Sequence, residues 1–293
     1  MTLASDPAAP TLERLRPAHL PELLRWLQSD PVLHVYLTAL ALRDALAAPH
    51  DETWAARRLG EIVGVLHLGG RSGAVLPHGG DREAFVQLAE VARARRAALP
   101  PRLQVIGPVR AVEIFVQAFR RDGLEARLHR RQVYLSLEGR HLPDIERVPA
   151  LRPARPEDYS LVYESGAALR DEELGEDPRR ADPRGYPRRV EEECRDGHTW
   201  LWVEGGQLRF RASISAATAD AAQVSGVYTP PELRGRRYAT RGLAELCTRL
   251  LARSRHACLF VNDFNVPALA LYRRLGFRSI ADWASAFYDP PAS

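Results

Sequence analysis

The chain has 293 residues, of which 45% are hydrophobic and 27% are charged, and its formal net charge is +4. The length suits two domains better than one, and the composition is that of a soluble globular protein. No run of 18 apolar residues occurs, so a membrane-spanning helix is not expected. The first residues, Met1–Pro7, lack the basic and apolar regions of a signal peptide. We therefore expect a cytoplasmic protein.

The charged and sulfur-containing residues carry little functional signal on their own. All 41 basic residues are arginine, and they are spread along the chain rather than gathered in one tail. Nucleic-acid binding is therefore not indicated by charge alone. Cys194, Cys247 and Cys258 match no zinc-ligand spacing. We expect them to be reduced thiols, buried or half-buried.

The first half of the chain alternates predicted strands and helices. Asp81 precedes one amphipathic helix as a plausible N-cap, and Asp122-Gly123 is a typical stop signal for another. Strands are predicted at 11–16, 53–59, 62–68, 74–77, 103–106 and 126–137, and helices at 18–29, 31–46, 81–98 and 109–121. Residues 139–149 contain prolines and many charges, and they are interpreted as a linker.

The second half repeats this order at the level of pattern. Residues 170–189 are dense in charge, proline and glycine, which predicts a long loop that covers a site. Strands are predicted at 198–204, 207–216, 222–229, 257–261 and 277–288, and helices at 156–168, 190–195, 236–253 and 266–275.

One chemistry-bearing segment runs from a predicted strand into a helix. The strand ends at Val227-Tyr228-Thr229, two prolines follow, and Arg234-Gly-Arg-Arg-Tyr-Ala-Thr240 opens the helix. A helix N-terminus has free backbone N–H groups and a partial positive charge, so it binds phosphate well. Gly235 would let a ligand approach the backbone, and the arginines add charge-assisted donors. The alternative is an ordinary helix start with solvated arginines.

A second segment, Asn265–Phe277, begins about thirty residues further on. Asn265 is a good N-cap, and Pro267 is tolerated in the first turn. Tyr272 lies on the apolar stripe of the predicted helix, and Gly276 ends it. By itself, this position favours a core or rim aromatic residue over a hydroxyl donor.

Together these segments resemble the GNAT (Gcn5-related N-acetyltransferase) superfamily. The acyl-CoA pyrophosphate loop of that family, Arg/Gln-x-x-Gly-x-Gly/Ala, falls on Arg234 to Ala239, and its fourth position, usually glycine, is Arg237 here. We expect Arg237 in the first helical turn, with negative φ and no strain. The family's Asn-x-x-Ala-x-x-Leu-Tyr-x-x-x-Gly-Phe pattern falls on Asn265 to Phe277. The resemblance covers roughly residues 150–290.

The first half resembles the degenerate half of tandem members of the family. Its nearest equivalent to the loop is Pro77-His-Gly-Gly-Asp-Arg82, which lacks an arginine cluster. The resemblance implies an α/β (α+β) fold of two GNAT-like domains, each with a mixed, mostly antiparallel central sheet flanked by helices. We place a degenerate domain at 1–138, the linker at 139–149 and a catalytic, acyl-CoA-binding domain at 150–293.

The resemblance also implies roles for individual residues. Val227, Tyr228 and Thr229 would offer backbone groups to pantetheine, and Asn265 would contact it. Tyr272 would contact CoA and protonate the leaving thiolate. The pyrophosphate would be bound by the loop and the helix start, namely Arg234, Gly235, Arg236, Arg237, Tyr238, Ala239 and Thr240. The reaction would be direct transfer of acetyl from acetyl-CoA to an amine, without a metal.

The general base and the acceptor are less well defined by sequence. Glu172, Glu173, Glu204 and Asp220 are the candidates for the base, and Glu173 is preferred because such segments line the acceptor groove in this fold. The acidic residues of 170–189 suit a cationic acceptor, and a solvated loop explains them equally well. Two alternatives stay open: a non-catalytic CoA-binding or scaffold protein, and an aminoacyl-tRNA-dependent transferase. Monomer and homodimer are both consistent with the sequence.

Overall fold

The computed structural model describes residues 9–289. These residues form two compact units. Unit 1 contains the described residues up to Tyr134 together with those from Ala281 onward, and unit 2 contains Leu135–Ile280. Two long strands, β6 (Leu128–Glu138) and β12 (Arg278–Tyr288), run across the division, so each contributes residues to both units. The expected domain ranges, 1–138 and 150–293, stay a prediction.

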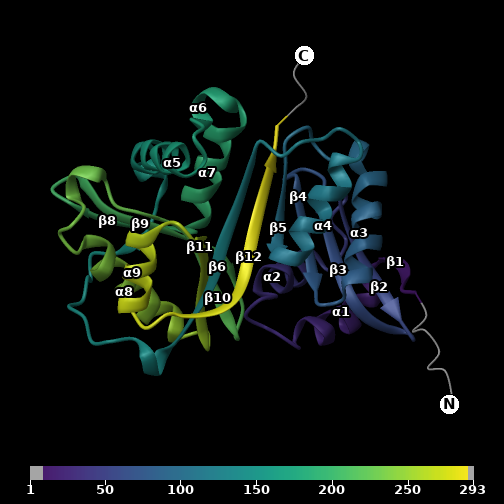
Figure 1. Ribbon diagram of the computed structural model, residues 1–293. Helices are drawn as coiled ribbons and strands as arrows, with labels where there is room; N and C mark the ends of the chain where they lie inside the picture. Colours follow the sequence, from purple (N-terminus) through teal and green to yellow (C-terminus); the bar gives the residue numbers. More distant parts are fainter. Residues whose placement is uncertain (1–8, 290–293) are drawn as a thin grey trace. The chain divides into compact units, whose positions relative to one another are not determined.

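Unit 1 has a mixed sheet with the strand order β1-β2-β3-β4-β5-β12. All neighbouring pairs are antiparallel except β4 and β5, which are parallel. The other elements of the unit are β1 (Thr11–Leu15), α1 (Leu20–Leu27), α2 (Val35–Asp44), β2 (Asp51–Arg58), β3 (Glu61–Gly69), β4 (Ala74–Gly79), α3 (Arg82–Ala94), β5 (Leu103–Pro108) and α4 (Val109–Arg120). Helices α3 and α4 lie together in Figure 1.

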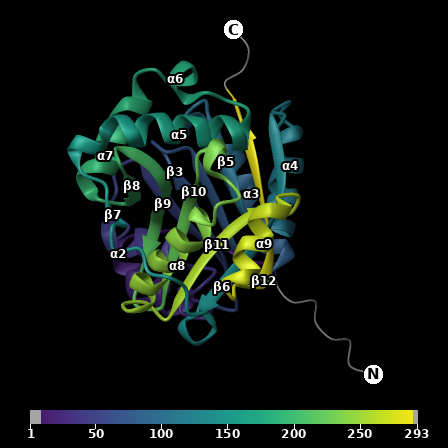
Figure 2. The same cartoon turned by 90° about the vertical axis from the view of Figure 1, so that its left-hand side faces the viewer.

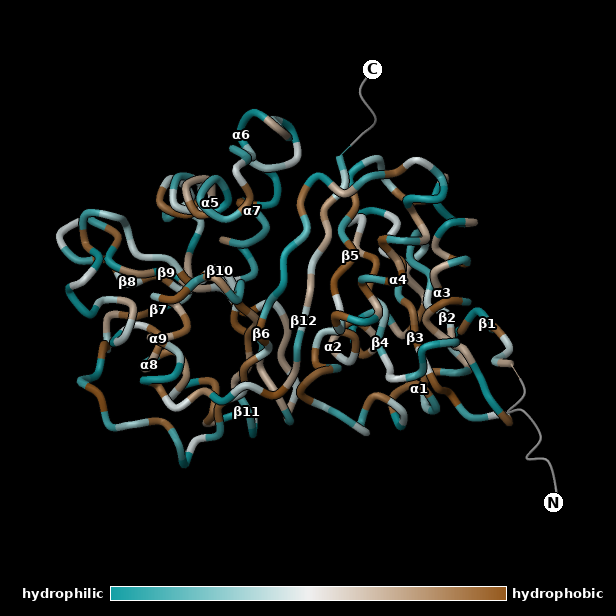
Figure 3. Tube along the Cα trace, in the orientation of Figure 1, coloured by the Kyte–Doolittle hydropathy of each residue, from teal (hydrophilic) through white to brown (hydrophobic). Residues whose placement is uncertain are grey.

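Two hydrophobic cores lie on the two faces of this sheet. Alternate residues of a strand face opposite sides, so Ala55 packs with α1 and α2 whereas Ala56 packs with α3 and α4. Figure 3 shows long hydrophobic stretches in the central strands of the unit. The predicted strands and helices of this half are confirmed, although α2 starts at Val35 rather than at residue 31.

The last strand of the chain completes unit 1. Residues Trp283–Tyr288 of β12 pair antiparallel with β5, and the Ser285 hydroxyl donates to Gln132 Oε1 of β6 at 2.7 Å. Strand β5 therefore pairs with β4 on one side and with the C-terminal strand β12 on the other.

Unit 2 has a sheet in which β11, β10, β9, β8 and β7 follow one another. Phe210 of β9 contacts the helix that begins at Tyr238, and its neighbour Arg211 contacts the helix that begins at Tyr159, so these helices cover opposite faces (Figure 2). The elements are β7 (Arg152–Pro153), α5 (Tyr159–Leu174), α6 (Pro178–Ala181), α7 (Gly185–Asp196), β8 (Thr199–Glu204), β9 (Gln207–Ala217), β10 (Ala221–Tyr228), α8 (Tyr238–Leu251), β11 (His256–Asn262) and α9 (Val266–Arg274).

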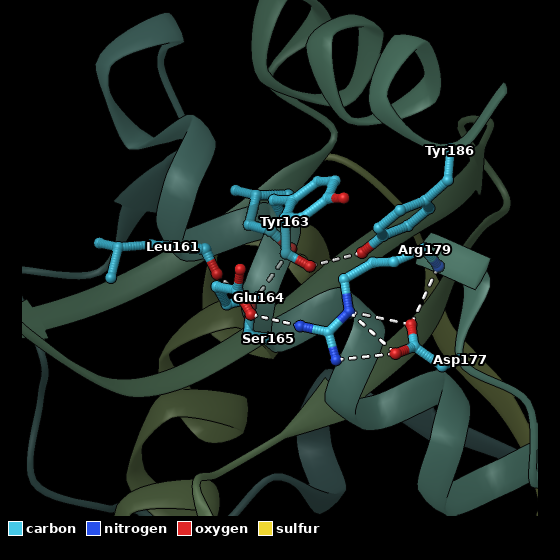
Figure 4. A network of polar contacts seen from close by, with 8 residues as sticks. Leu161, Tyr163, Glu164, Ser165, Asp177, Arg179 and Tyr186 are labelled. Carbon is cyan, nitrogen blue, oxygen red and sulfur yellow. Dashed lines mark hydrogen bonds and ion pairs between the residues drawn. The ribbon is translucent and has the colours of Figure 1, made fainter. Parts of the chain in front are cut away.

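Residues 170–189 are helical rather than one long loop, which corrects the sequence-based expectation. Gly175 ends α5 in the left-handed conformation with φ 63°, and the Asp177 side chain caps α6 by accepting from the Arg179 N–H at 2.9 Å. Arg179 also reaches Glu164 of α5 at 2.6 Å (Figure 4). The glycine, proline and charges that resemble a loop are therefore helix caps and the ion pairs between short helices.

The segment expected to be a linker, 139–149, is held to α8 by a buried carboxylate. Glu245 is 2% exposed, and it accepts from Arg147 at 2.6 and 3.1 Å, from Arg249 at 2.8 Å and from the Val148 N–H at 3.2 Å. These bonds, the one from Arg147 first, lower the pKa of Glu245 to about 2.

The Glu245 contacts give a stability prediction. Its pKa in the folded protein is below the ordinary value, so its contribution is complete near neutral pH and is lost as the pH falls toward 2. We expect Glu245→Gln to lower the free energy of unfolding by about 2 kcal/mol at pH 6. At pH 3.5 we expect the difference in free energy of unfolding between the wild-type protein and this variant to be about 1 kcal/mol smaller. Urea unfolding at both pH values measures this.

The control for this experiment is Glu146→Gln. Glu146 also pairs with an arginine, Arg241 at 2.8 Å, but its side chain is 75% exposed. We expect its loss to change stability by less than about 0.5 kcal/mol. An effect of E245Q that is equally small, or that does not change with pH, contradicts this account.

Candidate active site

The site in unit 2 begins where two parallel strands part. The paired register of β10 and β11 ends at Gln223↔Cys258, although both strands continue for several residues. The register of β10 with β9 also shifts between Ser225 and Tyr228, and Gly226 lies between them with φ 59°. This bulge turns the backbone of the strand end, including Val227, out of the regular ladder.

The segment after β10 forms an open, cationic turn. Gly235 has φ 77°, and a Cβ there would meet nothing within 4 Å, so a ligand has room to approach the backbone. Arg236 and Arg237 are exposed, and no ion pair of either side chain is found within residues 9–289. Helix α8 starts directly after Arg237 and has no side-chain cap, so its first backbone N–H groups face outward without an acceptor from a capping side chain.

The conformation of Arg237 differs from the sequence-based expectation. It has φ 65° and ψ 10°, the left-handed conformation, and it is the N-cap of α8 rather than a residue of its first turn. Glycine adopts this conformation easily, whereas an L-residue with a Cβ pays about 1–2 kcal/mol. The expectation of negative φ was wrong because the chain needs a second left-handed residue to turn into the helix.

Two residues expected near the cofactor are already engaged with each other. The Arg234 Nη2 group donates to both oxygens of Glu172, at 2.8 and 2.7 Å, and its Nε donates to the Thr229 carbonyl at 3.1 Å. The guanidinium also lies 5.7 Å from the centre of the Tyr228 ring. Glu172, one candidate base, therefore connects α5 to this turn.

The other residues of the expected loop are ordered by packing. Tyr238 stacks edge to face on Trp202 at 5.1 Å, with the Arg209 guanidinium 5.6 Å from its ring. Ala239 is half-buried, and Thr240 is buried in the first turn of α8. These contacts fix the direction in which the helix N-terminus points.

Tyr272 and Asn265 occupy the positions that their helix pattern predicts. The Asn265 side chain accepts from the Ala268 N–H at 3.2 Å and so caps α9. Tyr272 is 6% exposed, and its ring lies edge to face with Phe277 at 5.8 Å. Burial raises the pKa of the Tyr272 hydroxyl, and the charge of Glu173 adds to this effect. Glu173 is therefore close enough to Tyr272 to act on it electrostatically.

Glu173 is the one candidate base that lines a recess. The recess has a volume of about 250 Å³ and is bounded by α5, α7, β9 and β10, including the bulge at Ser225 and Gly226. Glu173 is exposed to it at the end of α5, yet protein atoms around the carboxylate remove part of its hydration and raise its pKa, and Glu172 adds to the rise. A carboxylate with a raised pKa accepts a proton more readily near neutral pH.

The remaining candidates lie elsewhere. Glu204, at the end of β8, accepts from the Trp202 Nε1–H at 2.8 Å. Asp220 precedes β10 and lies 3.7 Å from Arg255. The three cysteines, all within residues 9–289, are buried thiols that form no disulfide, and burial raises the pKa of Cys247 to about 12, which argues against a thiolate nucleophile.

Sequence reasoning missed Arg211, Tyr186 and Ser225, which line the same recess. Arg211 is 4% exposed. The available signal was an arginine between Phe210 and Ala212 in a strand that is otherwise apolar at its centre. The contribution of Tyr186 was hidden by the interpretation of its segment as a loop.

Unit 1 has a similar parting of strands, but its helix start differs. The register of β4 and β5 ends at Val75↔Val105, and α3 follows β4. The Asp81 side chain caps α3 by accepting from the Ala84 N–H at 2.9 Å, and Arg58 pairs with it at 2.8 Å. A carboxylate thus occupies the place where an anionic ligand would bind, and the segment 77–82 offers no phosphate site of the α8 kind.

A protein family matches this part of the chain. Residues 167–277, which contain the parted strands, the turn, α8 and α9, match the acetyltransferase (GNAT) family. This segment of unit 2 is therefore similar to the GNAT acetyltransferase family. No curated protein sequence matches it. None of the helices within residues 9–289 combines the length and hydropathy of a bilayer-spanning segment.

Solved structures extend the likeness in fold to the whole chain. A Drosophila protein has a TM-score of 0.69 at 13% identity, with 96% of this chain and 99% of that chain covered. A GCN5-related N-acetyltransferase from Sphaerobacter thermophilus has a TM-score of 0.59 at 17% identity, covering 98% of each chain. A tandem GNAT protein from the clavulanic acid biosynthesis pathway has a TM-score of 0.54 at 16% identity, covering 97% and 99%. The two-part GNAT fold expected from sequence is confirmed.

The left-handed conformation of Arg237 gives a second testable prediction. Arg237→Gly removes the Cβ that makes this conformation unfavourable, so we expect the free energy of unfolding to stay equal or to rise by up to about 1 kcal/mol. Arg237→Ala removes the same guanidinium and keeps the Cβ, so no such gain is expected. Urea unfolding of the two variants compares them directly, and an R237G variant less stable than R237A contradicts the assignment.

Proposed function

We propose that this protein is an acyl-CoA-dependent N-acyltransferase that transfers acetyl from acetyl-CoA directly to an amine. The observation that carries the proposal is the N-terminus of α8, which has no side-chain cap and follows a turn with an open glycine and two exposed arginines. It lies in the same unit as a recess with a carboxylate at its edge. In this proposal the diphosphate of the donor binds at the N-terminus of α8, and a small acceptor binds in the recess.

The donor fits the residues present. The first N–H groups of α8 and the guanidinium groups of Arg236 and Arg237 supply donors for a pyrophosphate. The backbone at Gly226 and Val227, in the bulge of β10 and beyond its paired register with β11, supplies hydrogen-bonding groups for the amides of pantetheine. Asn265 stands at the start of α9 with its side chain used as a cap. It is proposed to contact the same arm.

The Arg234–Glu172 pair belongs to this description. Both side chains are about half exposed, so replacing Glu172 by another anionic partner of Arg234 costs little free energy. A pyrophosphate would compete with Glu172 for the guanidinium. We infer that donor binding loosens the end of α5 at Glu172, next to Glu173.

The chemistry needs one proton acceptor and one proton donor. Glu173 takes a proton from the ammonium form of the acceptor, and the free amine attacks the thioester carbonyl. A C–N bond forms, the C–S bond breaks, and the thiolate receives a proton from the Tyr272 hydroxyl. The nitrogen of the new amide then loses its extra proton, which returns through solvent to the Tyr272 phenolate and restores the hydroxyl. Burial keeps that hydroxyl protonated at neutral pH, so it is available as a hydrogen-bond donor while negative charge develops on sulfur.

The role of Tyr272 is testable by conservative substitution. Tyr272→Phe removes only the hydroxyl, so we expect kcat for acetyl transfer to fall about 10²-fold while the Kd for acetyl-CoA changes by less than about threefold. Release of free CoA thiol with a panel of amines and amino acids, together with calorimetry of acetyl-CoA, separates the two quantities.

Tyr288→Phe is the matched control. Tyr288 is also a buried tyrosine, its hydroxyl has no hydrogen-bond partner, and it lies in unit 1. We expect this variant to keep full activity. Full activity of Y272F would contradict the assigned role, and binding of acetyl-CoA without turnover by the wild-type protein on any amine would favour the non-catalytic alternative.

A further inference from the structure

Arg211 is a buried cation at the recess that holds Glu173. It lies on β9 and is 4% exposed, and it is one of the residues that bound the recess. Its Nη1 group donates to the Val162 carbonyl at 3.0 Å and to the Ser165 hydroxyl at 3.1 Å, both on α5. Space beside it is tight, because a Cβ on Gly166 would lie 2.9 Å from Nη1. The guanidinium is therefore held in one place.

The charge of Arg211 is only partly balanced by the protein. Its nearest carboxylate is Glu193, at 3.5 Å from Nη2, which is long for a charge-assisted hydrogen bond. The same Glu193 oxygen also accepts from the Thr199 hydroxyl at 3.0 Å, and the side chain is 39% exposed. The Arg211 Nε–H finds no acceptor among residues 9–289. A buried guanidinium with incomplete pairing is costly, and a ligand anion would reduce that cost.

Other charged side chains also line the recess. They are Arg170, Arg189, Glu173 and Glu193. The acidic residues of 170–189 do not form an acidic rim, because Asp177 pairs with Arg179 and Asp182 with Arg189 at 2.7 Å. The incomplete pairing of the buried Arg211 therefore favours an acceptor that carries an anionic group, rather than the cationic acceptor that the sequence of this segment suggested.

The size and walls of the recess limit the acceptor further. A volume of about 250 Å³ fits a molecule of amino-acid size and not a folded protein surface. Val162, Leu169, Leu174 and Val190 supply apolar wall, and the Tyr186 ring lies across from Tyr163 at 5.0 Å. Its hydroxyl donates to the Tyr163 carbonyl at 2.6 Å (Figure 4), which fixes the ring.

We propose that the acceptor is a small amino acid with an apolar side chain, whose carboxylate pairs with Arg211 while its amine faces Glu173. This rests on the proposed function and specifies its substrate class. The two charged groups of such an acceptor are close together, as are Arg211 and Glu173, each of which perturbs the other electrostatically. The product keeps its carboxylate but loses the ammonium charge. Its uncharged amide nitrogen is therefore no longer attracted to the Glu173 carboxylate.

The experiment compares matched ligands on the wild-type protein, so it does not depend on a variant that folds. CoA-thiol release is measured with the standard amino acids, and the best is compared with its amide and with its decarboxylated amine. We expect kcat/KM for the free acid to exceed that of both analogues by at least about tenfold, the discrimination that one charge-assisted pair supplies. Equal or better turnover of the analogues, or no turnover of any amino acid, overturns the proposal.

Variants test whether Arg211 is the residue responsible. Arg211→Lys keeps a charge but loses the planar fork, and Arg211→Met removes the charge. We expect both to raise KM for the amino acid and to reduce the preference over its amide, while calorimetry shows unchanged acetyl-CoA binding. Arg255→Met removes an exposed arginine of the same unit. We expect it to change neither the KM for the amino acid nor the preference for the amino acid over its amide. An unchanged preference in folded R211K or R211M would overturn the assignment.

Different experimental results would contradict the proposed function and this inference. Absence of acetyl-CoA binding by the wild-type protein would remove the proposed function itself. Binding of acetyl-CoA with acetylation of simple amines would leave that function in place and exclude only the carboxylate-bearing acceptor. The ligand comparison is therefore interpreted after donor binding has been measured.

Discussion

The site in unit 2 depends on a helix that starts without a cap. The first N–H groups of α8 need acceptors, and neither Arg237 at the N-cap nor the turn before it supplies a side-chain oxygen. The equivalent helix start in unit 1 is satisfied by Asp81. One carboxylate thus distinguishes a self-contained helix start from one that leaves its first N–H groups available to the proposed anion. The parting of β10 from β11 after three paired residues would give that anion a path to the helix.

Helices α8 and α5 of unit 2 pack on opposite faces of β9 and border different parts of the site. Helix α8 packs through Gly242 against Phe210 on one face of β9, where a Cβ would lie 2.5 Å from the ring. Helix α5 packs on the other face, where Arg211 donates to its carbonyl. The donor side and the acceptor side therefore meet at β9 and β10. The Glu172–Arg234 pair connects α5 to the turn before α8, and in the proposed function it is the contact through which donor binding would influence the recess.

Much of the fold could be predicted from sequence, because its strands alternate regularly and its helices carry standard signals. Asp81 and Asn265 cap the helices that their positions predict, and Gly205-Gly206 joins the two strands on either side of it. The family resemblance rested on residues 234–239 and 265–277, which follow the parted strands and keep their order in the structure. These are local patterns, so one sequence is enough to show them.

The parts that could not be predicted depend on contacts distant in sequence. Residues 170–189 resemble a loop because their helices are short and capped, and Arg179 finds Glu164 fifteen residues away. Whether Arg237 adopts positive φ depends on the whole turn. The burial of Arg211 depends on α5 lying over β9. For the same reason the sequence could prefer Glu173 among four carboxylates only through the family resemblance, and it could not show the recess that Glu173 lines.

The central claim is that the turn at residues 234–237 and the start of α8 bind the pyrophosphate of an acyl-CoA. Calorimetry of acetyl-CoA tests it most directly, with the wild-type protein, an Arg234→Ala/Arg236→Ala variant and an Arg253→Ala/Arg255→Ala variant that loses two exposed arginines at the other end of α8. The account predicts binding that weakens at least about tenfold in the first variant and is unchanged in the second. No binding by the wild-type protein, or an equal loss in both variants, would contradict it.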